Sequence, residues 1–274
     1  MTSSNGYDEP AVAGSGTIAC GLATSASVLG EVWLLARSDA SASRAEEAVE
    51  KAAANHKGAS AERIRVTNEP KKLADCDLVV EAIAEDADAK GELLASLAQA
   101  APDADLASTT SSLSIADLGD RAKAPDRVFG LHVFNPVPRM ELIELCVPDS
   151  ARDGLAERAH AWCSALGKTP IEVPDSTGFV VNRLLFPYLF DAVRFMEESG
   201  MTPAAVDDCM SLGAGHPMGP LKLLDFVGLD VAVAIGESLG DLVGDEAHSA
   251  PALIAEMVAD GKLGRKSGEG FYKY

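Results

Sequence analysis

Pro10-Ala-Val-Ala-Gly-Ser-Gly-Thr-Ile-Ala19 is the most informative stretch for the architecture of this chain. Its first four residues predict a short apolar strand, and the small apolar residues 20–29 predict a helix directly after it. Gly14 allows a tight turn, Gly16 lets a pyrophosphate approach the backbone, and Ala19 permits close packing of helix on strand. The order of strand, glycine turn and helix therefore predicts a dinucleotide-binding site.

The net charge of the chain requires that any phosphate be bound by local features. The 42 acidic and 23 basic residues give a formal charge of −19, which repels nucleic acid and anionic membranes. Thr17 and Ile18 lie in the turn just before the predicted helix, whose N-terminus offers the backbone amide donors and partial positive charge that favour an anion. We expect the pyrophosphate there, and neither nucleic acid nor a membrane as a partner.

The sequence gives no indication of export or of a metal site. No apolar run reaches the ~20 residues that cross a bilayer, and residues 1–9 lack the basic and apolar regions of a signal peptide. The five cysteines are widely spaced and include no Cys-x-x-Cys pair. This spacing is typical of reduced thiols rather than of disulfides or zinc ligands, so we expect a cytoplasmic protein without bound metal.

The end of the second predicted strand, residues 31–35, indicates which dinucleotide binds. An NAD enzyme usually carries an acid here for the ribose 2′-hydroxyl, but this chain has Arg37 and Ser38. The guanidinium and the hydroxyl can bind a 2′-phosphate, which favours NADP. In the alternative, Arg37 points into solvent and Asp39 turns back to the ribose, which makes NAD the second choice.

Alternation of strands and helices gives way to helices alone in the second half of the chain. Residues 63–67 and 77–83 predict buried parallel strands, residues 39–60 and 150–166 predict helices, and helical periodicity continues from Leu184, with Pro187 predicting a kink. The prediction is an α/β, Rossmann-type dinucleotide-binding domain at residues 9–181, followed by an all-helical domain at residues 182–274.

A histidine and a glutamate twelve residues apart form the candidate catalytic pair. His132 stands before a proline-containing turn, and Glu144 lies in an apolar run that predicts a strand. A carboxylate that orients an imidazole and stabilises its cation makes a general acid/base, provided that the turn folds back. A structural histidine before a strand is the alternative, and the spacing alone does not separate the two.

The same segment resembles the signature of the 3-hydroxyacyl-CoA dehydrogenase family, His-Phe-Phe-Asn-Pro-x-x-x-Met-x-Leu-x-Glu. Here it reads His132-Val-Phe-Asn-Pro-Val-Pro-Arg-Met-Glu-Leu-Ile-Glu144, with Val133 in place of an aromatic residue. Residues 175–183 and 261–274 are also similar to the family, so the resemblance covers about residues 9–274. It departs mainly at residues 39–60, where the family has a longer helical arm that contacts coenzyme A.

The resemblance implies roles for individual residues. His132 would be the acid/base with Glu144 as its partner, while Ser111 and Asn182 would donate hydrogen bonds to the substrate oxygen. The implied cofactor contacts are Glu85, Lys90, Thr109 and Asn135. Thr109 stands where the family has asparagine, which keeps a donor and an acceptor but shortens the reach.

Three of these implied roles have a structural alternative. A Ser/Thr-rich turn explains Ser111 and its neighbours, a helix-dipole partner explains Glu85, and a helix cap explains Asn182.

The resemblance further implies reversible hydride transfer between NADP(H) and C3 of a short 3-hydroxyacyl or 3-oxoacyl thioester. The expected substrate pair is acetoacetyl-CoA and (S)-3-hydroxybutyryl-CoA, bound between the two domains of a homodimer that associates through the helical domain. Two alternatives stay open. In the first, the enzyme acts on a thioester of an acyl carrier protein in secondary metabolism. In the second, the chain is a non-enzymatic relative similar to lens crystallins.

Overall fold

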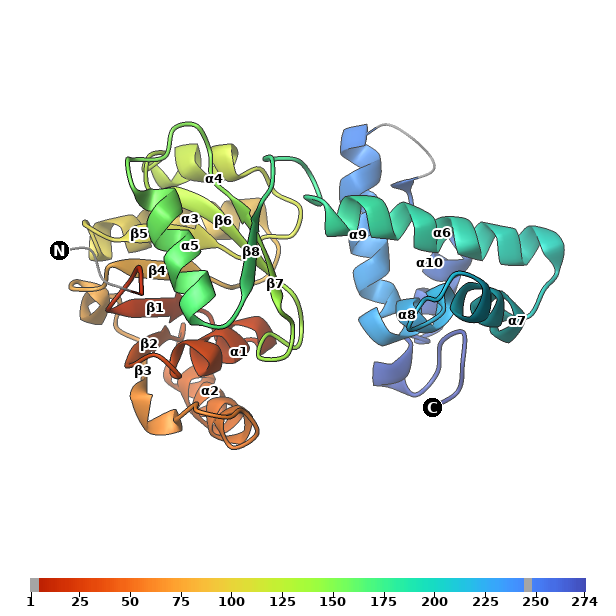
Figure 1. The fold of residues 1–274 in the computed structure, drawn as a ribbon, viewed down its shortest axis with the longest axis horizontal. Coiled ribbons are helices and arrows are strands. Elements are labelled where there is room, and N and C mark those ends of the chain that lie inside the picture. Colours follow the sequence, from red (N-terminus) through yellow and green to blue (C-terminus); the bar gives the residue numbers. More distant parts are fainter. Residues whose placement is uncertain (1–4, 244–247) are drawn as a thin grey trace. The chain divides into compact units, whose positions relative to one another are not determined.

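The computed structural model describes residues 5–243 and 248–274 and divides the chain into two compact units, Met1–Ser176 and Thr177–Tyr274 (Figure 1). Within the described residues, no helix combines the length and apolar character needed to cross a membrane. All five cysteines are free thiols, and Cys209 alone among them is exposed.

The first unit is built on one eight-stranded sheet in the order β3-β2-β1-β4-β5-β6-β7-β8. Strands β1 to β6 are mutually parallel, β7 is antiparallel to β6, and β8 is parallel to β7. The strands are β1 (Pro10–Ala13), β2 (Val32–Leu35), β3 (Ile64–Thr67), β4 (Leu78–Glu81), β5 (Asp105–Ser108), β6 (Val128–Val133), β7 (Leu142–Cys146) and β8 (Thr169–Glu172). The central strands are buried along their whole length because helices cover both faces of a parallel sheet.

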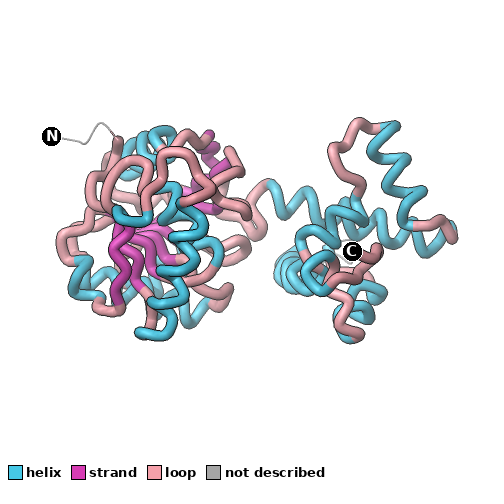
Figure 2. Tube along the Cα trace, turned by 90° about the horizontal axis from the view of Figure 1, so that it is seen from below, coloured by secondary structure: helices cyan, strands magenta, loops and turns pink. Residues whose placement is uncertain are grey.

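The helices of this unit surround the strands, which Figure 2 shows gathered in its interior. They are α1 (Thr17–Ala26), α2 (Asp39–Ala53), α3 (Ala87–Ala100), α4 (Ile115–Ala122) and α5 (Leu155–Ala165), with short 3₁₀ turns η1 (Ala61–Arg63) and η2 (Pro70–Leu73). Two helices are shorter than predicted. α2 ends at Ala53 rather than residue 60, and α5 begins only at Leu155, because Gly154 with φ +77° breaks the helical path before it.

The order of the strands reverses at β1, whose neighbours are β2 on one side and β4 on the other. Ligands of open parallel sheets bind outside the carboxyl ends of the strands at such a point. Gly14 follows β1 here with φ +150°, and a Cβ atom at this position would lie 2.3 Å from the carbonyl oxygen of Ala82. Only glycine therefore lets the end of β1 pass this close to the end of β4.

Apart from two isolated β-bridges within residues 264–273, the described residues of the second unit form helices and their connections. They are α6 (Val181–Ser199), α7 (Pro203–Asp208), the π-helical turn η3 (Cys209–Gly213), α8 (Pro220–Val227), α9 (Leu229–Val243), α10 (Ala252–Ala259) and the 3₁₀ turn η5 (Arg265–Ser267). α6 runs through Pro187 as one helix, and Phe186, Leu189, Phe190 and Val193 on its inner face join the core. A Rossmann-type α/β unit followed by a helical unit is the fold class that the sequence predicts, and it is confirmed.

A buried carboxylate at the amino end of β5 connects three segments of the chain. Asp105 on β5 is fully buried and accepts hydrogen bonds from Tyr7 Oη at 2.6 Å, Arg152 Nε at 2.7 Å and Arg158 Nε at 2.9 Å. Burial and the charge of Asp105 raise the pKa of Tyr7 far above its usual range, so the phenol remains a donor. The start of the chain, β5 and α5 therefore meet at one carboxylate.

We expect Asp105→Asn to lower the free energy of unfolding by roughly 3 kcal/mol, since it leaves two arginines beside a neutral group. Urea denaturation measures the change. Asp103→Asn, two residues earlier and exposed, is the matched control and is expected to change stability by less than about 0.5 kcal/mol. Equal effects of the two substitutions would contradict the role of Asp105.

Candidate active site

His132 and Glu144 face each other on neighbouring antiparallel strands. They form a directly opposed pair in the β6–β7 ladder, and His132 Nδ1 lies 2.6 Å from Glu144 Oε2. The side chains are 4% and 2% exposed, and the Phe134 ring lies 4.5 Å from the imidazole between centroids. The structure therefore brings together the two residues that the sequence singles out, in a setting that excludes water.

The protonation pattern of this pair follows from the short contact. A carboxylate accepts hydrogen bonds, so the Nδ1 atom of His132 carries a proton when Glu144 is ionised. The charge of Glu144 also stabilises the imidazolium form of His132. This is the arrangement of a histidine that acts as a general acid and base.

Glu85 fixes the hydroxyl-rich loop after β5. Its Oε1 atom accepts hydrogen bonds from Thr110 Oγ1 at 2.6 Å, the Ser111 amide at 2.8 Å, and the Ser112 amide and hydroxyl, both at 3.0 Å. Burial works against ionisation of Glu85, but the charge of Lys90 and these hydrogen bonds hold its pKa below the ordinary value. The carboxylate is therefore ionised at neutral pH and anchors the loop.

Glu85 binds two of the four hydroxyls in residues 109–112 and leaves the other two available to a ligand. Thr110 and Ser112 turn toward Glu85, whereas the hydroxyls of Thr109 and Ser111 make no hydrogen bond within residues 5–243 and 248–274. Thr109 and Ser111 are the residues that the resemblance assigns to ligands, and the anchoring roles of Thr110 and Ser112 were not predicted.

Lys90 lies beneath this loop and is completely buried. Its Nζ atom contacts Glu81 Oε1 at 2.8 Å and Glu85 Oε2 at 3.4 Å, and Ser108 Oγ donates to Glu81 at 2.6 Å. The cluster joins the ends of β4 and β5 to α3. The structure thus places Lys90 in a buried ion cluster, and its predicted contact with the cofactor stays a prediction.

The glycine turn after β1 leaves donors available at the start of α1. Gly16 is the N-cap residue, no side chain caps the helix, and a Cβ atom at Gly16 would meet nothing within 4 Å. The backbone amides of Thr17 and Ile18 lie in the uncapped first turn. Packing within the protein therefore leaves room for a side chain at position 16. A glycine at this position instead fits a backbone that a ligand approaches closely.

A pocket of about 210 Å³ lies beside this turn, and Arg37 is one of the residues that line it. Ser38 caps α2 and shares hydrogen bonds with Ser41, so its hydroxyl is partly committed to the helix. The carboxylate of Asp39 accepts a hydrogen bond from Asn68 Nδ2 at 2.6 Å. The acid that the NAD alternative would use is therefore bound to a neighbour.

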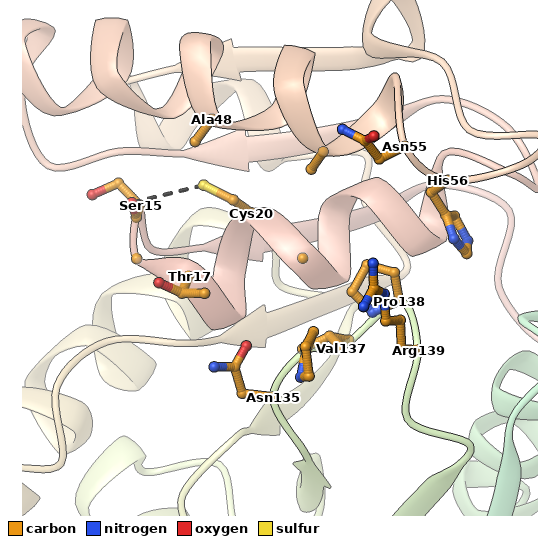
Figure 3. A pocket seen from close by; sticks show the side chains of 14 residues that line it. Ser15, Thr17, Cys20, Ala48, Asn55, His56, Asn135, Val137, Pro138 and Arg139 are labelled. Atoms are coloured by element: carbon orange, nitrogen blue, oxygen red, sulfur yellow. Dashed lines mark hydrogen bonds between the residues drawn. The ribbon is translucent and has the colours of Figure 1, made fainter. Parts of the chain in front are cut away.

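A larger pocket of about 450 Å³, here named the α1–α2 pocket, is lined by residues of the glycine turn, of α1 and α2, and of the turn between β6 and β7. Figure 3 shows Asn55 and His56 on one side and the turn residues Asn135 and Arg139 on the other, with α1 between them. Among the described residues that line it, none is acidic, although the chain has 42 acids. The pocket is thus suited to a ligand that carries negative charge.

Asn182 belongs to the second unit, where it is the second residue of α6 and 8% exposed. The helix begins at Val181 and has no side-chain cap, so the alternative in which Asn182 caps α6 is wrong. Among the described residues, no cluster of three or more His, Cys, Asp or Glu side chains could hold a metal ion.

Comparisons with known proteins agree with this architecture. Residues 10–176 match the family model of the 3-hydroxyacyl-CoA dehydrogenase NAD binding domain, and residues 178–274 match that of its C-terminal domain. A probable 3-hydroxybutyryl-CoA dehydrogenase of Deinococcus radiodurans is 45% identical over 213 residues, which are 77% of each chain.

Solved structures show the same likeness over nearly the whole chain. FadB2 of Mycobacterium tuberculosis superposes with a TM-score of 0.92 at 36% identity, covering 97% of this chain and 98% of that one. The (S)-3-hydroxybutyryl-CoA dehydrogenase PaaH1 of Ralstonia eutropha gives 0.89 at 35% identity, covering 98% and 99%. The NAD-binding domain indicates a nicotinamide dinucleotide as the cofactor. The chain belongs to the 3-hydroxyacyl-CoA dehydrogenase family.

Proposed function

We propose that this chain transfers hydride reversibly between NADP(H) and C3 of a short 3-hydroxyacyl-CoA, with acetoacetyl-CoA and (S)-3-hydroxybutyryl-CoA as the substrate pair. The observation that carries the proposal is the hydrogen bond between His132 and Glu144. It lies at the carboxyl edge of the sheet, where the glycine turn also lies. Relatives named 3-hydroxybutyryl-CoA dehydrogenase support the choice of substrate.

His132 handles the proton of the reaction. When bound, the nicotinamide cofactor supplies or accepts the hydride at C3. In the reducing direction the imidazolium of His132 gives its Nε2 proton to the oxygen on C3, and the carbonyl becomes a hydroxyl. In the oxidising direction the neutral ring takes that proton back. Glu144 keeps the proton on Nδ1 and stabilises the cation in both directions.

Ser111 and Asn182 are proposed to donate hydrogen bonds to the substrate oxygen as it gains negative charge. The hydroxyl of Ser111 is not used by the Glu85 anchor, which supports its assignment. Asn182 is assigned from the resemblance of residues 175–183 to the family. A donor aimed at a developing oxyanion stabilises it by about 3 kcal/mol.

The α1–α2 pocket supports a substrate with a phosphate-bearing carrier. Coenzyme A and acyl carrier protein both present a phosphopantetheine arm, and the described residues that line this pocket include Arg139 and His56 but no acid. An anionic arm is therefore favoured there over a neutral or cationic ligand.

His132→Ala and Glu144→Ala are expected to lower kcat roughly 10²- to 10⁴-fold, because the reaction loses its proton carrier or the group that orients it. Ser111→Ala and Asn182→Ala are expected to lower it roughly 10²-fold. The assay follows NADPH absorbance with acetoacetyl-CoA, and the Kd for NADPH is expected to change little.

A second histidine–glutamate pair supplies the control for this experiment. His160 and Glu172 lie 2.8 Å apart at the surface of the same unit, so His160→Ala is expected to leave kcat unchanged. Near-normal kcat in both His132→Ala and Glu144→Ala would overturn the mechanism. Wild-type turnover of a carrier-protein thioester alone would favour the secondary-metabolism alternative, and turnover of neither would favour the crystallin-like one.

NADP is proposed as the preferred cofactor because of the charges beside the smaller pocket. Arg37 lies at its lining, where a guanidinium can bind a 2′-phosphate in a charge-assisted manner. The carboxylate of Asp39, which would repel that phosphate and bind a free ribose, is already hydrogen bonded to Asn68.

Arg37→Asp is expected to reverse the cofactor preference. Loss of a charge-assisted contact lowers kcat/KM for NADPH roughly 10- to 100-fold, and the new carboxylate can accept hydrogen bonds from the ribose of NADH. The ratio of kcat/KM for the two cofactors is the measurement. Arg44→Asp on α2 makes the same change of charge as a control. A wild-type preference for NADH would refute this assignment.

We also propose that the chain forms a homodimer through its helical unit. Large apolar side chains that are this exposed favour a surface that a second protein chain covers. In this unit they are Leu184 (69% exposed), Phe195 (54%), Leu212 (86%) and Phe226 (49%).

Light scattering is expected to give a mass about twice the 28.5 kDa of one chain. Phe195→Glu places a charge on the proposed interface and is expected to shift the mass toward the monomer. Ile171→Glu makes the same change at an exposed position of the first unit and is expected to leave the dimer intact. A monomeric wild type would exclude the proposal.

A further inference from the structure

Lys168 is held in a fixed position at the end of α5. Gly167 has φ +73°, its amide donates to the Ser164 carbonyl at 2.9 Å, and the Lys168 amide donates to the Cys163 carbonyl at 3.0 Å. These two bonds are those of a Schellman motif, which closes a helix through a left-handed glycine. The backbone of Lys168 is thus rigid, and its side chain starts from a defined point.

The ammonium group of Lys168 reaches the turn between β6 and β7, residues 134–141. Its Nζ atom donates to the carbonyl oxygens of Val137 at 2.7 Å and Met140 at 2.8 Å. The turn itself is short of donors, because Pro136 and Pro138 have no N–H group. The amides of Arg139 and Met140 both bond to the Pro136 carbonyl. Lys168 therefore supplies donors that the turn lacks.

The same turn also packs against α1. Val137 is 2% exposed, and a Cβ atom added to Gly21 would lie 3.1 Å from Val137 Cβ. The turn is thus held both by packing against α1 and by the hydrogen bonds from Lys168. Residues 135–139 of this turn form one wall of the α1–α2 pocket, while Lys168 itself is not among the residues that line it (Figure 3).

We propose that Lys168 is a positioning residue that sets this wall and thereby the affinity for the thioester substrate, without contacting the substrate. The inference rests on the proposed function, in which the α1–α2 pocket receives the carrier arm. His132 and Glu144 are held by the β6–β7 ladder rather than by the turn. Loss of Lys168 therefore weakens substrate binding and leaves the proton transfer intact.

The experiment compares KM and kcat for acetoacetyl-CoA in the wild type and three variants. Lys168→Met keeps the length of the side chain but removes its donors, and it is expected to raise KM at least tenfold with kcat within threefold. Lys168→Arg keeps charge and donors and is expected to return KM to within threefold of the wild type. Lys72→Met removes an exposed lysine elsewhere and is expected to change neither constant.

The outcomes separate this inference from the function on which it rests. A KM within twofold of the wild type in Lys168→Met, or a loss confined to kcat, overturns the role of Lys168. Failure of Lys168→Arg to restore KM does the same. If Lys168→Met does not fold, Lys168→Gln, which keeps two donors without the charge, is expected to show an intermediate KM, and a wild-type KM refutes the proposal. No turnover by the wild type refutes the function instead.

Discussion

The contact between His132 and Glu144 exists because β7 reverses direction against β6. Strands β1 to β6 are all parallel, and a further parallel neighbour would need a crossover of a dozen or more residues. The tight return instead places two residues that are twelve positions apart directly opposite each other. Opposed residues of a ladder project from the same face of the sheet, so the register alone aligns imidazole and carboxylate. Burial of both side chains then strengthens the hydrogen bond between them.

The parallel part of the sheet contributes by gathering the ends of several strands at one edge. The glycine turn follows β1, Glu85 follows β4, and the hydroxyl-rich loop follows β5. Buried Lys90 joins two of these ends through Glu81 and Glu85. A buried ion cluster adds little net stability, but removal of one partner is costly, so it fixes one arrangement of the groups that it connects. The loop with Ser111 is therefore held in place before any ligand arrives.

Local patterns in the sequence were enough to predict the order of strand, glycine turn and helix from residue 10 onward, and the fold class that follows from it, although α1 spans Thr17–Ala26 rather than the predicted residues 20–29. Long-range contacts were not predictable in this way. Glu85 anchors residues about 26 positions away, and Lys168 reaches a turn 31 positions away, so neither pairing leaves a periodic signal. β8 was not predicted either, because Thr169, Pro170 and Glu172 interrupt the apolar pattern at the exposed edge of the sheet.

An acidic chain can bind phosphates because its positive features are local. The uncapped start of α1 presents backbone amides, which carry no net charge and are unaffected by the composition of the surface. Arg37 stands beside the smaller pocket and Arg139 beside the larger one. Surface charges farther away than about 10 Å are largely screened at physiological salt, whereas groups within the pockets are not. A net charge of −19 therefore disfavours polyanionic partners that cover a wide surface, and under the proposed function the dinucleotide and the thioester arm depend on these few local groups.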